Sequence, residues 1–299
     1  MATAPSDSFR IPHELWFEEL TPGYPVIKVS NRHAKATIAL LGATLIEYTP
    51  TGSQPVIFTS SEAVFQEGKA IRGGIPVCWP WFGPHPTDSS KPNHGFARDR
   101  FWELKSTTKH EDYTEVTLEF DTRQVANELW PQHTTAEITF KIGQALDVQL
   151  TSCNRSDSSI TIGGALHTYF DIAHISDVSV IGLDGVTFAD KVTNKHGSQS
   201  GALTFTQETD LVFEKTMATT TIEDRGNSRQ IHVAKNGSRS TVVWNPWIEK
   251  SAGMGDLGNE DYLGFVCVET ANAFDDVYTL EPGAIHTLGT TITVNTSLS

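Results

Sequence analysis

The chain has 299 residues, enough for one large β-domain or two smaller domains, and its 38% hydrophobic and 19% charged residues are typical of a globular protein with a substantial core. The formal net charge of −14 repels nucleic acids and anionic membrane surfaces, so we exclude both as partners. The longest apolar runs are shorter than the roughly 18 residues that a membrane-spanning helix needs, so none is predicted.

Cysteine usage and the N-terminal sequence predict the cellular compartment. Cys78, Cys153 and Cys267 are odd in number, lie in apolar or strand-like stretches and form no Cys-x-x-Cys motif. We expect them to be reduced and buried, which is typical of a cytoplasmic protein. The N-terminal residues lack the basic segment and the apolar core of a secretory signal.

Short alternating runs, separated by turn residues, recur along the chain. The clearest cover residues 115–120, 136–142 and 146–153, and Gly143 predicts a hairpin between the last two. Gly42 interrupts two earlier runs and predicts a bulge or a tight turn. Further strands are predicted at residues 26–29, 36–41, 44–48, 178–181, 203–206, 219–222, 230–234, 240–244 and 284–294. Runs at this spacing, without a repeat or a linker, predict an all-β sandwich in a single domain.

Residues 71–100 differ from the rest of the chain because glycine, proline and tryptophan are dense there and no period persists. We predict a rigid loop, since Trp79, Trp81 and Phe82 are large apolar side chains that need burial. The two tryptophans are either a platform on which a sugar ring stacks or core residues beneath the loop.

Two arginines flank this loop in an otherwise acidic chain. Arg72 and Arg98 would together make a local anion site, because the guanidinium fork suits phosphate. The alternative is that both form surface salt bridges with neighbours such as Asp99.

Two apolar runs carry side chains that suit acid–base chemistry. In residues 264–272, alternation places Phe265, Cys267 and Glu269 on one face of a strand that we predict to end at this carboxylate. Residues 163–171 lead in the same way to His167, whose side chain ionises near neutrality. Glu269 and His167 are an acid–base pair if the fold brings them together; otherwise one is a surface carboxylate and the other a structural histidine.

Other chemistries lack their motifs. No Gly-x-Gly-x-x-Gly sequence opens a helix and no P-loop is present, so a nucleotide cofactor has no support. The eleven histidines lack metal-ligand spacing, and no Gly-x-Ser-x-Gly elbow marks a serine hydrolase. We therefore predict neither a metal nor an organic cofactor.

Five separated motifs carry a family resemblance. They are Arg72-Gly-Gly-Ile-Pro-Val-Cys-Trp-Pro-Trp-Phe-Gly, His94-Gly-Phe-Ala-Arg98, His167-Thr-Tyr-Phe, Val243-Trp-Asn-Pro-Trp247 and Cys267-Val-Glu-Thr-Ala-Asn272. In this order, over residues of about 25–293, they resemble the glucose-6-phosphate 1-epimerases, the hexose-6-phosphate mutarotases of the aldose 1-epimerase superfamily.

The resemblance implies one galactose-mutarotase-like β-sandwich with few short helices, a single domain over residues 1–299. It implies a catalytic pair, His167 and Glu269. The substrate-binding residues that it implies are Arg72, Asn93, His94, Arg98 and Asp210. Asn93 stands where the family commonly has glutamine, so its side chain is one methylene shorter, and Asp210 matches by its place in Glu208-Thr-Asp-Leu.

The reaction implied by the resemblance exchanges the two anomers of a hexose 6-phosphate. Glu269 takes the proton of the anomeric hydroxyl and His167, as imidazolium, protonates the ring oxygen; the ring opens, the C1–C2 bond rotates and the ring closes to the other anomer. The alternatives are a mutarotase of unphosphorylated hexoses and a non-catalytic carbohydrate-binding or regulatory protein on the same fold. We expect a monomer whose partner is a small sugar phosphate.

Overall fold

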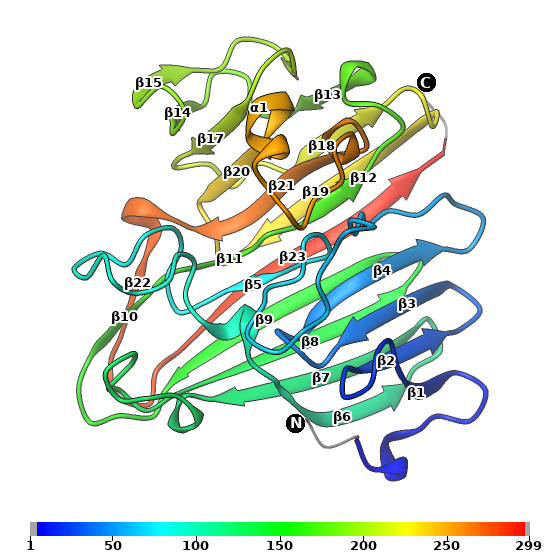
Figure 1. Ribbon diagram of the computed structural model, residues 1–299, viewed down its shortest axis with the longest axis vertical. Helices are drawn as coiled ribbons and strands as arrows, with labels where there is room; N and C mark the ends of the chain where they lie inside the picture. Colours follow the sequence, from blue (N-terminus) through cyan, green and yellow to red (C-terminus); the bar gives the residue numbers. More distant parts are fainter. Residues whose placement is uncertain (1–4, 297–299) are drawn as a thin grey trace.

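The computed structural model describes residues 5–296, and the regular structure in this range is almost entirely antiparallel β-strand (Figure 1). Two large sheets, a four-stranded sheet and a two-stranded ribbon account for the strands of these residues. The predicted all-β fold is therefore confirmed.

The largest sheet contains nine of the described strands. Its spatial order is β16 (Leu203–Thr204), β13 (Val178–Ile181), β18 (Thr220–Asp224), β19 (Arg229–Asn236), β23 (Ile285–Asn295), β9 (Leu146–Asn154), β8 (Thr134–Gly143), β7 (Tyr113–Asp121) and β6 (Glu103–Lys109). Every second side chain along most of β8 is buried, so Ile138 and Phe140 face the core while Lys141 does not. The hairpin predicted at Gly143 joins β8 to β9.

The second large sheet carries the chemistry described below. Its order is β15 (Lys195–Ser198), β14 (Thr187–Asp190), β17 (Thr209–Phe213), β20 (Ser240–Asn245), β21 (Phe265–Asn272), β11 (Gly164–Leu166) and β5 (Val77–Cys78), while β12 (Tyr169–Asp171) also pairs with β21. Strand β21 is thus bordered on both sides, and all its residues are buried.

The remaining regular elements are short. The four-stranded sheet contains β1 (Leu15–Glu19), β2 (Pro25–Ser30), β3 (Ala34–Ala39) and β4 (Thr44–Pro50), and the ribbon contains β10 (Ile160–Ile162) and β22 (Tyr278–Leu280). The helical segments are α1 (Trp247–Ala252) and the 3₁₀ turns Asp7–Phe9, Ala97–Asp99, Thr122–Gln124, Ile175–Asp177, Asp261–Leu263 and Phe274–Asp276. Among the residues that the structure covers, no helix has the length and hydrophobicity needed to cross a bilayer.

One hydrophobic cluster connects the three larger sheets. It includes Ile38 and Leu45 from the four-stranded sheet, Phe140 from the nine-stranded sheet, and Val266 and Val268 from β21. Because the inward faces of the sheets meet in this cluster, the architecture is a sandwich, as predicted.

The strands predicted from alternation are present with shifted boundaries, but the prediction missed several others. Strands β6, β14 and β15 expose many of their side chains, so their sequences carry little hydrophobic alternation. Neighbouring strands hold them in the sheet by backbone pairing, which a local pattern does not reveal.

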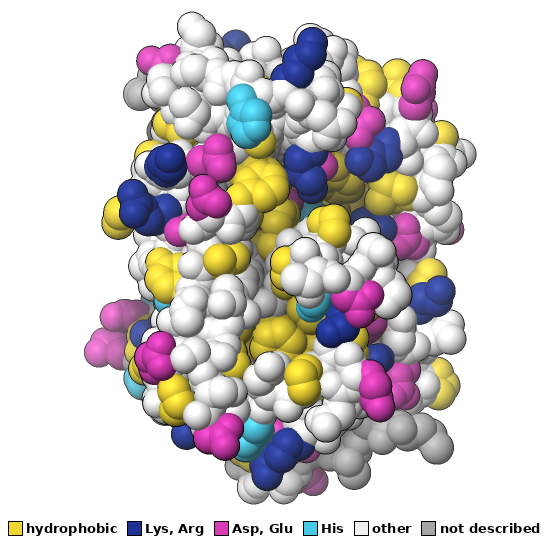
Figure 2. Space-filling model, turned by 90° about the vertical axis from the view of Figure 1, so that its left-hand side faces the viewer, with side chains coloured by type: hydrophobic (Ala, Val, Ile, Leu, Met, Phe, Trp, Pro, Cys, Tyr) yellow, Lys and Arg dark blue, Asp and Glu magenta, His cyan; other side chains and the backbone are white. Residues whose placement is uncertain are grey.

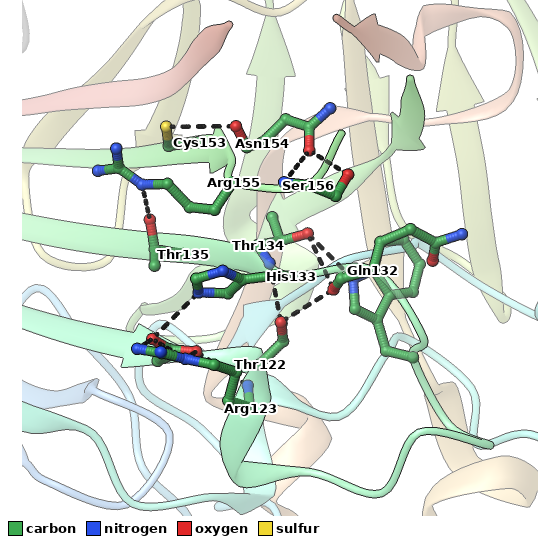
Figure 3. A network of polar contacts seen from close by, with 12 residues as sticks. Thr122, Arg123, Gln132, His133, Thr134, Thr135, Cys153, Asn154, Arg155 and Ser156 are labelled. Carbon is green, nitrogen blue, oxygen red and sulfur yellow. Dashed lines mark hydrogen bonds and ion pairs between the residues drawn. The ribbon is translucent and has the colours of Figure 1, made fainter. Parts of the chain in front are cut away.

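A polar network fixes the connection between β7 and β8 (Figure 3). The Thr122 hydroxyl donates to the carbonyl of Gln132 at 3.0 Å and accepts from the backbone N–H of Thr134 at 2.9 Å. The Thr134 hydroxyl in turn accepts from the indole N–H of Trp130, whose ring stacks on Trp81 at 6.2 Å. Through the contact of Trp130 with Trp81, the network therefore packs against the Gly/Pro-rich loop.

Candidate active site

His167 lies in a break between two strands. Strand β11 pairs with β21 up to Leu166, and β12 resumes the pairing at Tyr169. The backbone N–H of His167 turns away from β21 and donates to the carbonyl of Pro76 at 3.0 Å. The interruption leaves the imidazole beside β21, with Nε2 at 3.3 Å from Oε1 of Glu269. The two residues, 102 positions apart in sequence, do meet.

Glu269 is not at the end of its strand, so that part of the prediction is wrong. Strand β21 continues to Asn272, and the Glu269 side chain is only 1% exposed. The predicted alternation is confirmed: Val266 and Val268 pack in the main core, while Phe265 and Cys267 belong to a second cluster on the opposite face.

Burial sets the electrostatics of this pair. It lowers the pKa of His167 well below its usual value, with smaller contributions from the nearby His94, Arg98 and Arg72. It raises the pKa of Glu269 well above its usual value, assisted by the charge of Asp210. Both shifts favour uncharged groups, so they favour a state in which the pair holds one proton and carries no net charge.

One polar atom of each partner is left unsatisfied. Nδ1 of His167 and Oε2 of Glu269 are buried and have no hydrogen-bond partner within residues 5–296. Buried polar atoms without partners are uncommon in folded proteins and concentrate where a ligand or an ordered water completes the site.

His94 presents its ring to the same place. Its φ is +66°, and its Nδ1 accepts the backbone N–H of Gly83 at 3.3 Å, which leaves the proton on Nε2. The ring lies 6.1 Å from that of His167. Burial, together with the nearby Arg98, Lys191 and Arg72, lowers the pKa of His94 to about 3, so it is a neutral hydrogen-bond donor.

Arg72 is paired, but not with the expected neighbour. Its Nε and Nη2 donate to the two carboxylate oxygens of Asp256 at 3.2 and 3.1 Å, and its Nη1 donates to the Tyr169 hydroxyl at 3.0 Å. Asp99 pairs with Arg100 instead.

Arg98 lies in the turn Ala97–Asp99 and has no carboxylate partner in the described part of the chain. Its Nη2 donates only to the backbone carbonyl of Asn93 at 3.1 Å, and the Asn93 residue itself is exposed. Gly42 sets this placement: with φ +68°, it approaches so closely that a Cβ would lie 2.5 Å from the carbonyl oxygen of Arg98. Gly42 therefore marks a tight turn, one of the two predicted options.

Asp210 is in strand β17 and is paired with a lysine that the sequence did not indicate. Nζ of Lys191 lies 3.4 Å from the Asp210 carboxylate and 5.6 Å from the centre of the Phe82 ring. Burial raises the pKa of Asp210, and Lys191 opposes that shift. Lys191 also opposes the rise in the pKa of Glu269, so its charge acts on that carboxyl group as well.

The tryptophan platform is not found. Trp79 and Trp81 belong to the main core, and their indole N–H groups donate to Ser152 and to the carbonyl of Pro92. Trp244, only 8% exposed, is the tryptophan whose ring lies edge-on to His167, with ring centroids 5.8 Å apart.

Sequence reasoning missed Lys191 and Asp256 as residues of this site, and it gave Tyr169 and Trp244 no role. Tyr169 and Trp244 lie inside motifs that were singled out, which was a usable signal. Lys191 and Asp256 follow no such motif and reach the site only through the tertiary fold.

The face of the molecule shown in Figure 2 is hollowed near its middle, and hydrophobic side chains are exposed in the hollow. Basic, acidic and histidine side chains lie around the edge of the hollow. Within residues 5–296, no group of three or more His, Cys, Asp or Glu side chains is arranged to hold a metal ion. The arrangement can bind an anion and move a proton.

Comparison with known proteins identifies a family and relatives of similar sequence. The model of the family described as Aldose 1-epimerase matches residues 25–293. Proteins named "Putative glucose-6-phosphate 1-epimerase" from Escherichia coli (strain K12) and Salmonella typhimurium are 38% and 35% identical to this chain, over 83% and 86% of it and 83% and 88% of their own lengths.

A solved structure shares the fold closely. The crystal structure of a "putative mutarotase" from Salmonella typhimurium superposes with a TM-score of 0.89 at 33% identity and covers 95% of both chains. The family model spans most of the chain, and the sequence relatives exceed 30% identity over more than four fifths of it. This chain belongs to the aldose 1-epimerase family.

Proposed function

We propose that this protein interconverts the α and β anomers of hexose 6-phosphates, with glucose 6-phosphate as the main substrate. The observation that carries the proposal is the approach of His167 Nε2 to Glu269 Oε1, 3.3 Å, in a buried site with basic residues around it. The names of the relatives point to the same substrate.

The two groups act on neighbouring oxygens of the sugar. The anomeric hydroxyl and the ring oxygen are both bonded to C1, so a carboxylate and an imidazole in mutual contact reach both from one side. Glu269 takes the proton from the hydroxyl and His167 gives a proton to the ring oxygen. After rotation about C1–C2, the reverse transfers close the ring. Positioned proton transfer accelerates such reactions by about 10²–10⁴-fold.

The phosphate also assists the proton arrangement. In the free protein, burial and the charges of Arg98 and Arg72 disfavour the imidazolium and lower the pKa of His167. A bound dianion offsets the arginine charges and therefore raises the pKa of His167. The shared proton then moves toward the imidazole, which gives the carboxylate–imidazolium form that ring opening requires.

The other site residues bind the sugar phosphate in this proposal. Arg98, which has no carboxylate partner among the described residues, binds the phosphate with help from Arg72. His94 donates a hydrogen bond from its Nε2–H to a sugar oxygen, and Asp210 accepts a hydrogen bond from a sugar hydroxyl. Asn93, which is exposed, contributes at the rim.

Anomer exchange measured by NMR with glucose 6-phosphate and with glucose tests the proposal. We expect catalysis of both, with a lower KM for the phosphorylated sugar. Arg98→Ala should raise KM about 10- to 100-fold for glucose 6-phosphate, because a charge-assisted contact contributes about 1.5–3 kcal/mol, and leave glucose almost unchanged.

Three outcomes separate the candidate functions. Equal loss on both sugars in the Arg98 variant excludes a phosphate role for this residue. Exchange of glucose at the same kcat/KM as glucose 6-phosphate favours a mutarotase of free hexoses. Binding without exchange favours the carbohydrate-binding alternative.

We also propose that the protein is a cytoplasmic monomer that needs neither metal nor organic cofactor and binds no nucleic acid. Proton transfer alone accomplishes the proposed reaction. The three cysteines are unpaired and buried, which suits a reducing compartment. A dimer in light scattering, or activity lost on dialysis against a chelator and restored by a metal, would contradict these proposals.

A further inference from the structure

A continuous series of contacts runs from the loop of residues 253–264 to the catalytic histidine. The Asp256 carboxylate accepts Nε and Nη2 of Arg72 at 3.2 and 3.1 Å. Nη1 of Arg72 donates to the Tyr169 hydroxyl at 3.0 Å. The Tyr169 ring is stacked on the His167 ring, with centroids 4.9 Å apart and planes at 16°.

The catalytic imidazole lacks the partner that usually orients such a ring. A carboxylate or a carbonyl commonly accepts the proton of the second ring nitrogen and fixes its orientation. Nδ1 of His167 has no partner within residues 5–296. Apart from the contact of Nε2 with Glu269, its orientation therefore depends on the rings around it: Tyr169 against its face and Trp244 at its edge.

Arg72 is largely occupied by this arrangement. A guanidinium has five N–H groups, and three of those on Arg72 are already donated to Asp256 and Tyr169. The adjacent carboxylate also offsets part of its charge, whereas Arg98 has no such partner in the described chain. The two arginines are therefore not equivalent.

We propose that Asp256, Arg72 and Tyr169 form a positioning chain that holds the His167 ring for proton transfer, and that Arg72 acts on the reaction mainly through Tyr169 while Arg98 supplies most of the charge that binds phosphate. This inference rests on the proposed function. It predicts losses in kcat that are independent of the phosphate group.

The test compares Tyr169→Phe, Asp256→Asn and Arg72→Lys on glucose 6-phosphate and on glucose. Tyr169→Phe keeps the stacked ring and removes the hydroxyl, and Arg72→Lys keeps the charge but cannot serve both neighbours. Because small displacements of a reacting group cost up to about 100-fold in rate, we expect kcat to fall about 10- to 100-fold on both sugars. KM should stay within about 2-fold. Glu260→Gln, an exposed position on the same loop, is the control.

The opposite results overturn the proposal. If Asp256 only competes with phosphate for Arg72, Asp256→Asn lowers KM for glucose 6-phosphate and keeps kcat. If the hydroxyl of Tyr169 is merely structural, Tyr169→Phe lowers the melting temperature without changing kcat or the pH profile.

A second measurement separates this inference from the proposed function. An NMR titration of the His167 imidazole nitrogens should show a changed shift or tautomer in Tyr169→Phe and none in Glu260→Gln. If the wild type exchanges neither sugar, the proposed function fails, and this titration alone decides whether the chain positions His167. An unchanged His167 signal in Tyr169→Phe would then reject the positioning chain.

Discussion

At the scale of single residues, the account depends on one proton held between an imidazole and a carboxyl group that are both buried. Burial lowers the pKa of His167 and raises the pKa of Glu269, so both shifts favour a state in which the pair carries no net charge. The basic residues nearby reinforce the first shift, and Asp210 reinforces the second.

The pH dependence of activity follows from these directions. As pH falls through the lowered pKa of His167, a second proton enters the pair and no base remains; as pH rises through the raised pKa of Glu269, the single proton is lost and no acid remains. We expect kcat/KM for glucose to be bell-shaped, with its acid limb below pH 6.5, the usual value for histidine.

This pH profile is best measured with glucose, because the phosphate monoester of glucose 6-phosphate ionises with a pKa of about 6 and adds its own acid limb. An acid limb for glucose at or above the usual histidine pKa would contradict the burial of the pair.

At the scale of elements, the interrupted pairing along β21 is what creates the site. Asp171 ends β12, and its backbone carbonyl accepts from Nη2 of Arg229, a fully buried residue of β19. Arg229 also binds the carbonyl of Pro55 at 2.6 Å and the buried carboxylate of Asp224 at 2.9 Å. The Arg229–Asp224 ion pair therefore connects β12, and His167 just before it, to the nine-stranded sheet.

Removing one partner of this buried pair should be costly. Asp224→Ala removes the nearest carboxylate from Arg229, which is 1% exposed, and leaves it only the longer contact with Asp171 at 3.6 Å. This change should lower the free energy of unfolding by about 3–5 kcal/mol. The double variant Asp224→Ala/Arg229→Met should recover much of that loss. Asp7→Ala, which breaks an exposed ion pair with Arg10, is the control and should change the free energy of unfolding by less than about 1 kcal/mol. Equal effects of Asp224→Ala and Asp7→Ala in urea unfolding would refute this role.

Local sequence patterns predicted these elements only in part. Alternation identified the two faces of β21 but placed Glu269 at its end, since Thr270 is followed by Ala271 and Asn272, two residue types that are depleted in strands. The flanking strand β20 extends the pairing to Ala271, and β11 extends it to Asn272. Tertiary context therefore overrides local preference. The contact of Arg72 with Asp256 spans 184 positions, and no local pattern predicts it.

At the scale of the whole molecule, the acidic surface contrasts with the basic cluster at the site. The formal net charge is −14, yet Arg72, Arg98 and Lys191 all lie close enough to lower the pKa of His94. Composition predicted only the overall charge. The motifs indicated Arg72 and Arg98 as an anion site. Only the folded chain shows that Arg72 is paired with Asp256 and that Arg98 has no carboxylate partner among the described residues.

We propose that residues 1–299 form one domain, because the main hydrophobic cluster draws on the four-, eight- and nine-stranded sheets together. Thermal unfolding should then show one calorimetric transition that coincides in tryptophan fluorescence and circular dichroism. Two resolved transitions would contradict a single domain.

The most direct test of the central claim is magnetisation-transfer NMR between the two anomeric protons of glucose 6-phosphate, with the wild type and with Glu269→Gln. The account predicts that the wild type accelerates exchange and that Glu269→Gln, which keeps the shape but cannot take a proton, loses about 10²–10⁴-fold in rate while still binding the sugar. Exchange by Glu269→Gln at the wild-type rate would contradict it.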